Sequence, residues 1–128
     1  MAALLLRTMF HYRELSKYAL HDFVIMPNHL HLILTPRGIT LERAIQLIKG
    51  GFSYRVTHEL KNMIEVWQKG FTDHRLRDAE DYEKHRHYVH LNAVKAGLCA
   101  SPDLYPYCSA NPIHKVDPVP QRLKPVAY

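Results

Sequence analysis

The sequence has no apolar stretch close to the roughly 18 residues that a membrane-spanning helix needs. The apolar run at residues 2–6 is interrupted at Arg7. A secretory signal needs an apolar core of about 7–15 residues followed by a small-residue cleavage site, and neither is found. Internal repeats and low-complexity segments are also absent. We therefore expect a cytoplasmic protein with no membrane partner.

Cysteine is scarce, since Cys99 and Cys108 are the only two. One pair nine positions apart forms neither a CxxC zinc motif nor the framework of a disulfide-rich secreted protein. In a reducing cytosol the expected state is two free thiols.

What the chain does contain is an ordinary globular composition with a basic balance. Its 128 residues are 47% hydrophobic and 23% charged, which fits a single folded domain. The net charge is +5 and the isoelectric point is near 9.3. A small basic chain favours polyanionic partners, above all nucleic acid.

The hydrophobic pattern predicts a mixed order of helices and strands. We expect helices over residues 4–17, from residue 41 onward, and over 79–95, with strands over 19–26, 29–35 and 64–69. Thr40 is a candidate N-cap, and Gly97 a candidate left-handed stop. This order predicts an α+β domain over residues 1–112, with an antiparallel sheet and helices on one face. Residues 113–128 are rich in proline and are expected to form an extended, partly mobile tail.

Two histidines mark the second predicted strand. His29 and His31 are two residues apart, so their side chains point the same way, with Cβ atoms about 6–7 Å apart. At that separation two imidazoles can share a metal ion. The leucines that alternate with them make the opposite face the core. The plain alternative is an ordinary pair of surface histidines.

A second motif lies on the last predicted helix. Tyr88 and Asn92 are four residues apart and share a helix face, with Lys84 and Lys95 near it. A tyrosine hydroxyl can act as a nucleophile, and the amide can be a third metal ligand. Two imidazoles and one amide leave coordination positions for phosphate oxygens. Taken alone, this spacing is also compatible with a purely structural role.

Aromatic and basic residues interleave between these motifs. Aromatic rings next to cations are the usual means of holding single-stranded nucleic acid, although Trp67 and Phe71 could also be core residues. The candidate nucleic-acid-binding residues across the chain are Lys49, Trp67, Lys69, Arg75, Arg77, Lys84 and Lys95.

Three segments together resemble one known family, the single-tyrosine HUH transposases, and in particular their REP-associated tyrosine transposase branch. Residues 24–34 (VIMPNHLHLIL) are similar to the family's histidine strand. Residues 67–77 are similar to its WQ…F.D segment, and residues 88–98 (YVHLNAVKAGL) to its tyrosine segment. The segments occur in the family's order, and the resemblance spans residues 4–112.

The resemblance implies a ferredoxin-like sheet and a metal-dependent reaction on single-stranded DNA hairpins. His29, His31 and Asn92 would hold Mg²⁺ or Mn²⁺. Tyr88 would attack a scissile phosphate, leaving a 5′-phosphotyrosine link and a free 3′-OH, and a second 3′-OH would reverse the step in strand transfer. The resemblance leaves open whether Tyr88 works with its own subunit's histidines or with those of a partner in a homodimer.

The sequence departs from the family pattern at its start, where the family's first strand is missing, and at Ala93, where the family commonly has proline. Two alternatives therefore stand beside an active transposase. One is a catalytically inactive relative that binds hairpin DNA or RNA. The other is a structural zinc domain, for which no fourth protein ligand is evident.

Overall fold

The computed structural model describes residues 2–27, 30–59, 74–75, 79–118 and 126–127, without the side chains of residues 57–59, 74–75, 79 and 126–127. Along the chain the elements are α1 (Ala2–Glu14), β1 (Tyr18–Ile25), β2 (Leu30–Pro36), α2 (Leu41–Glu59), β3 (His74–Arg75), α3 (Ala79–Lys95), a 3-10 helix (Pro102–Leu104) and β4 (Val126–Ala127). This arrangement confirms the predicted α+β class.

A hairpin of β1 and β2 forms the centre of the molecule. The strands are antiparallel, from Tyr18 opposite Pro36 to Ile25 opposite Leu30, and every residue of β1 is buried. The pairing shifts by one residue between Leu20 and Asp22, as in a β-bulge. The bulge reverses which positions of β1 face each side of the sheet. Residues before and after it can therefore contribute side chains to the same core.

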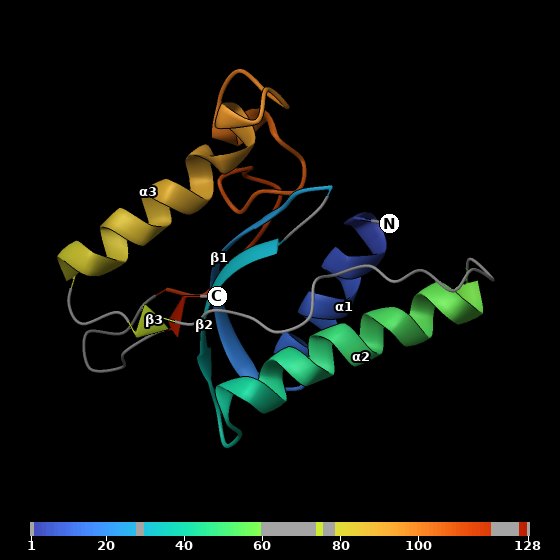
Figure 1. The fold of residues 1–128 in the computed structure, drawn as a ribbon. Coiled ribbons are helices and arrows are strands. Elements are labelled where there is room, and N and C mark those ends of the chain that lie inside the picture. The colour runs from blue at the N-terminus through green and yellow to red at the C-terminus, as the bar shows by residue number, and fades with distance from the viewer. Residues whose placement is uncertain (1, 28–29, 60–73, 76–78, 119–125, 128) are drawn as a thin grey trace.

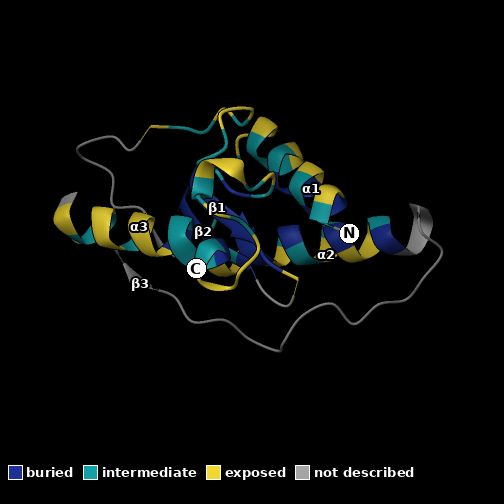
Figure 2. Ribbon diagram, turned by 90° about the horizontal axis from the view of Figure 1, so that it is seen from above, coloured by how far each residue is buried: buried dark blue, intermediate teal, exposed yellow. Residues whose placement is uncertain are grey.

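Helices α1 and α2 cover one face of this hairpin (Figure 1). The alternating leucines of β2, Leu30, Leu32 and Leu34, belong to their shared core. Figure 2 shows the buried sides of both helices turned toward the strands. The backbone N–H of Arg43 donates to the Thr40 hydroxyl at 3.1 Å, which confirms the predicted cap of α2.

Helix α3 lies on the opposite face (Figure 1). Its Val89 and Ala93 pack in a second, smaller core with Val24 and Ile33 of the hairpin and with the buried Cys108. The expectation of helices on one face therefore applies to α1 and α2 only. Because helices cover both faces of the hairpin, the face of β2 that carries His31 meets α3 rather than solvent.

Both edges of the hairpin are paired with later parts of the chain. On one side β4 pairs antiparallel with β2, with Ala127 opposite Ile33, and β3 pairs with β4, giving the sheet order β1-β2-β4-β3. On the other side Cys108 forms a bridge with Val24 of β1, and the Asp117 N–H donates to the Leu20 carbonyl at 2.7 Å. The first residues of the predicted proline-rich tail thus pack on the domain.

The bounds of the long elements agree with the sequence pattern. Helix α3 covers the predicted range and ends before Gly97, which has a φ of 76°. Helix α2 continues through Gly50 and Gly51. The strand predicted over residues 64–69 lies outside the described residues. No helix in the described ranges is long and apolar enough to cross a membrane.

Candidate active site

The structure places Tyr88 of α3 beside His31 of β2. Their ring centroids are 5.4 Å apart, and the rings meet edge to face at 77°. Tyr88 is 51% exposed, so about half of the residue is open to solvent. His31 alternates with Leu30 and Leu32, which pack toward α1 and α2, and its imidazole therefore emerges on the face that α3 covers.

Two further residues of α3 stand near this pair. The Lys95 ammonium lies 6.0 Å from the centre of the Tyr88 ring, within the range of a cation–π contact. Asn92 is half-buried and lies one helical turn after Tyr88, on the same face. The site therefore joins a phenol, an imidazole, an amide and a cation.

A single buried carboxylate fastens α3 to the hairpin. Asp22, which is 3% exposed at the bulge of β1, accepts a hydrogen bond from the Tyr82 hydroxyl. The same carboxylate lies 3.0 Å from Nε2 of His90 and 3.5 Å from Nε of Arg86. These three partners are spaced four residues apart, so they form one stripe along α3. The stripe holds the helix that carries Tyr88.

The surroundings of Asp22 suit anchoring rather than nucleophilic catalysis. His90 Nε2 lies 3.0 Å from Asp22 and 3.1 Å from the Ser109 hydroxyl. In a Ser-His-Asp triad the serine and the carboxylate use opposite ring nitrogens, so this arrangement is not a triad. Burial, with help from the hydrogen bond to Asp22, raises the pKa of Tyr82, which therefore remains a neutral donor.

This anchor was not among the features predicted from the sequence. The available signal was a charged residue, Asp22, inside an apolar strand pattern, together with Tyr82, Arg86 and His90 at a constant spacing of four. A buried carboxylate needs partners, and a helix with three donors on one stripe provides them.

Residues 4–92 match the family model described as "Transposase IS200 like". This match covers most of the chain. The chain belongs to the IS200-like transposase family.

Two individual transposases are similar to this chain over a stretch about as long as the family match. The REP-associated tyrosine transposase of Escherichia coli (strain K12) is 30% identical over 92 residues, which is 70% of this chain and 53% of that protein. A putative REP-associated tyrosine transposase of Haemophilus influenzae is 27% identical over 96 residues, or 66% of this chain and 54% of that protein. The chain thus spans about half the length of these relatives.

The fold is also similar to a solved structure of a REP-associated tyrosine transposase bound to a REP hairpin. The TM-score is 0.68 at 24% sequence identity, over 91% of this chain and 72% of that one. This likeness supports the α+β architecture of an IS200-like transposase domain.

The remaining predicted site residues of this transposase domain are scattered or not described. His29, Trp67, Lys69 and Arg77 lie outside the described residues, as does the side chain of Arg75, whose backbone belongs to β3. Lys84 is largely exposed and forms an ion pair with Glu80 at 3.4 Å. Lys49 belongs to α2, across the sheet from Tyr88.

Two of the three expected metal ligands lie in the described part of the chain. Within the described ranges, no group of three or more His, Cys, Asp and Glu residues could hold an ion. His31 and Asn92 offer one nitrogen and one oxygen donor near Tyr88, and the third expected ligand, His29, is not described. A mixed set of neutral nitrogen and oxygen donors is compatible with Mn²⁺, while Mg²⁺ prefers oxygen.

Proposed function

We propose that the chain cleaves and rejoins single-stranded DNA at hairpin ends, with Tyr88 as the nucleophile. The observation that carries the proposal is the contact between the Tyr88 and His31 rings, which joins the two sequence motifs across α3 and β2. Membership of the IS200-like transposase family supports the same reaction class.

In the proposed reaction the Tyr88 oxygen attacks a backbone phosphorus atom. The phosphorus bond to the 3′ oxygen breaks, the phenol loses its proton to solvent, and the departing 3′ oxygen takes up a proton. The product is a 5′-phosphotyrosine and a free 3′-OH. Attack by a second 3′-OH reverses the step and joins two strands, so no external energy source is needed.

The neighbouring side chains have distinct tasks in this proposal. Lys95 places a positive charge beside the Tyr88 ring, which favours the approach of a phosphate. His29, His31 and Asn92 would hold a divalent cation. When bound, that cation would supply Lewis-acid polarisation of the phosphoryl oxygens.

Charge and fold both favour a nucleic-acid substrate. The net charge of +5 attracts phosphate backbones. The similar solved structure is a transposase bound to a REP hairpin, which makes a DNA hairpin the first substrate to test. We therefore propose a hairpin with single-stranded flanks as the ligand.

The test is covalent capture of a labelled hairpin oligonucleotide with Mn²⁺ on a denaturing gel. The wild-type protein should form an adduct, and Tyr88→Phe should form none, because the phenol oxygen is the attacking atom. Chelation with EDTA should remove the adduct, and added Mn²⁺ should restore it. Tyr107→Phe, a tyrosine outside the site, serves as the matched control and should retain the adduct.

Two outcomes would refute this function and identify an alternative. Mobility shifts on a native gel without any denaturant-resistant adduct would indicate an inactive hairpin-binding protein. Stoichiometric zinc retained through purification, with no affinity for DNA, would indicate a structural zinc domain.

A further inference from the structure

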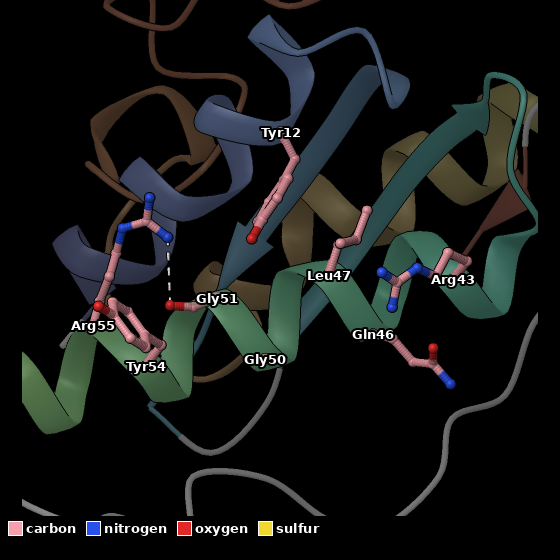
Figure 3. Close-up of a pocket in the computed structure, with 8 residues that line it drawn as sticks. All are labelled: Tyr12, Arg43, Gln46, Leu47, Gly50, Gly51, Tyr54 and Arg55. Atoms are coloured by element: carbon pink, nitrogen blue, oxygen red, sulfur yellow. Dashed lines mark hydrogen bonds between the residues drawn. The ribbon is translucent and has the colours of Figure 1, made fainter.

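A pocket of about 550 Å³ lies between α1 and α2, on the face of the sheet opposite Tyr88. Figure 3 shows its lining, in which Tyr12 comes from α1 and all other residues come from α2. The volume falls within the range of about 300–1,000 Å³ typical of ligand sites. The family match and the candidate active site do not account for this feature. The lining residues are Tyr12, Arg43, Gln46, Leu47, Gly50, Gly51, Tyr54 and Arg55.

The charge of the pocket is entirely positive. Arg43 and Arg55 lie toward opposite ends of it, and none of the lining residues is acidic (Figure 3). Among the described residues, no carboxylate lies within ion-pair distance of either guanidinium, and Arg55 reaches the Gly51 carbonyl at 3.4 Å. The two arginines are twelve positions apart, or about 18 Å along the helix. This spacing matches phosphates several nucleotides apart on one strand and is too wide for a single small anion.

The two glycines in the floor of the pocket differ in their surroundings. A Cβ on Gly51 would lie 2.8 Å from the Tyr12 ring and 3.1 Å from Thr8, so close packing of α1 explains that glycine. A Cβ on Gly50 would have nothing within 4 Å. Glycine weakens a helix interior relative to alanine, so packing gives no reason for Gly50. A bare backbone in open space is what close approach of a ligand requires.

An aromatic ring completes the pocket. Tyr54 is 65% exposed, which is unusual for a large ring on a helix that otherwise packs its apolar side against the sheet. Its position next to Arg55 puts an aromatic face beside a cation (Figure 3). Bases of single-stranded nucleic acid stack on such rings while cations follow the backbone.

We propose that this pocket binds a single-stranded segment of the nucleic acid. Arg43 and Arg55 contact its phosphates, the strand passes close over Gly50, and a base stacks on Tyr54. This assignment rests on the proposed function for its ligand, but it adds a second contact surface away from the reacting phosphate. The hairpin flank would then be held on both faces of the sheet.

The test is fluorescence anisotropy with a labelled hairpin that carries long single-stranded flanks. Binding is measured in EDTA with the Tyr88→Phe variant as the background, so that no cleavage intervenes. Arg43→Gln/Arg55→Gln should weaken binding about tenfold and lower the slope of log Kd against log salt by about 1.4, because about 0.7 is lost per single-strand phosphate contact. A hairpin without flanks should show little of this loss.

The matched control is Arg37→Gln/Lys115→Gln, which removes two exposed cations outside the pocket. If the control and the pocket variant lose affinity equally, the effect is one of general charge and the proposal is wrong. The proposal is also wrong if the background protein does not bind the flanked hairpin.

Gly50 provides a readout that a folding defect cannot imitate. Gly50→Ala and Gly50→Gln should leave the thermal midpoint unchanged or higher, because helix propensity improves and no neighbour is struck. Gly50→Gln should nevertheless weaken binding several-fold. Unaltered affinity in Gly50→Gln would overturn the close approach. Adduct formation by the wild-type protein is measured separately. Failure to form the adduct would contradict the proposed function. Absence of pocket-dependent binding would contradict this inference.

Discussion

At the scale of single residues, His21 shows how the buried strand β1 handles a titratable group. Its Nδ1 lies 2.8 Å from the Asp117 carbonyl oxygen, and its Nε2 lies 2.8 Å from the Thr35 hydroxyl. Because a carbonyl can only accept, Nδ1 carries the proton and Nε2 of the neutral ring accepts from Thr35. Burial lowers the pKa of His21, although the carbonyl and nearby carboxylates oppose this shift.

This lowered pKa predicts a pH-dependent contribution to stability. The unfolded chain takes up a proton near pH 6.5, whereas the folded ring resists protonation, so the contribution is complete above about pH 6.5 and is lost as pH falls through the lower folded pKa. His21→Asn keeps a donor but does not titrate. The stability advantage of wild type over this variant should shrink between about pH 7.5 and about pH 5 in urea unfolding. A pH-independent difference would contradict the prediction.

Residue patterns also show what a sequence can reveal about the site. The contact between Tyr88 and His31 was predictable, because strict alternation fixed the face of His31 and a four-residue spacing fixed that of Tyr88. The role of Asp22 was not, because its partners lie 60 and 68 positions away on another element. Polar pairs between distant segments produce no periodic pattern in the local sequence, so they cannot be predicted from it.

At the scale of elements, α3 is positioned by one carboxylate and a small apolar patch. Tyr82, Arg86 and His90 converge on Asp22, while Val89 packs against the hairpin. Because Tyr88 belongs to the same helix, the position of this proposed nucleophile depends on the attachment.

Asp22→Asn should therefore weaken the attachment of α3. A neutral amide cannot accept as strongly from Tyr82 and offers no charge to Arg86, so the free energy of unfolding should fall by about 1–3 kcal/mol. The rate of adduct formation should fall more than hairpin affinity does. Denaturant unfolding and single-turnover capture are the two measurements.

The control for that prediction is Asp117→Asn. Asp117 also binds β1, but its carboxylate pairs with Arg13 of α1 at 2.8 Å and receives the Leu20 N–H. It should lower stability without slowing adduct formation at saturating DNA. Equal slowing in both variants would show that Asp22 has no specific effect on α3.

Elements differ in how far the sequence predicts them. The bounds of α3 follow from local signals, an acidic first turn and Gly97 after its end. Strands β3 and β4 have two residues each, too few to show alternation. They are strands only because each pairs with a neighbour, and that is information about the assembled sheet.

At the scale of the whole molecule, the sheet depends on segments that are far apart in sequence. Strand β2 carries His31, and its two edges are covered by β1 and by β4, which lies some ninety positions later in the chain. An exposed edge beside an apolar strand invites pairing with other molecules. The last residues of the chain therefore protect the strand that carries the candidate site.

Removing residues 126–128 should expose that edge. Amide hydrogen exchange in β2 should accelerate about tenfold, since a lost backbone hydrogen bond contributes about 1 kcal/mol or somewhat more. The shortened protein should also associate with rising concentration in size-exclusion chromatography. Removal of Tyr128 alone keeps Ala127 opposite Ile33 and should change neither measurement. If β2 exchanges at the same rate in both proteins, β4 does not protect β2, and the fold depends on the β1–β2 hairpin and its helices alone.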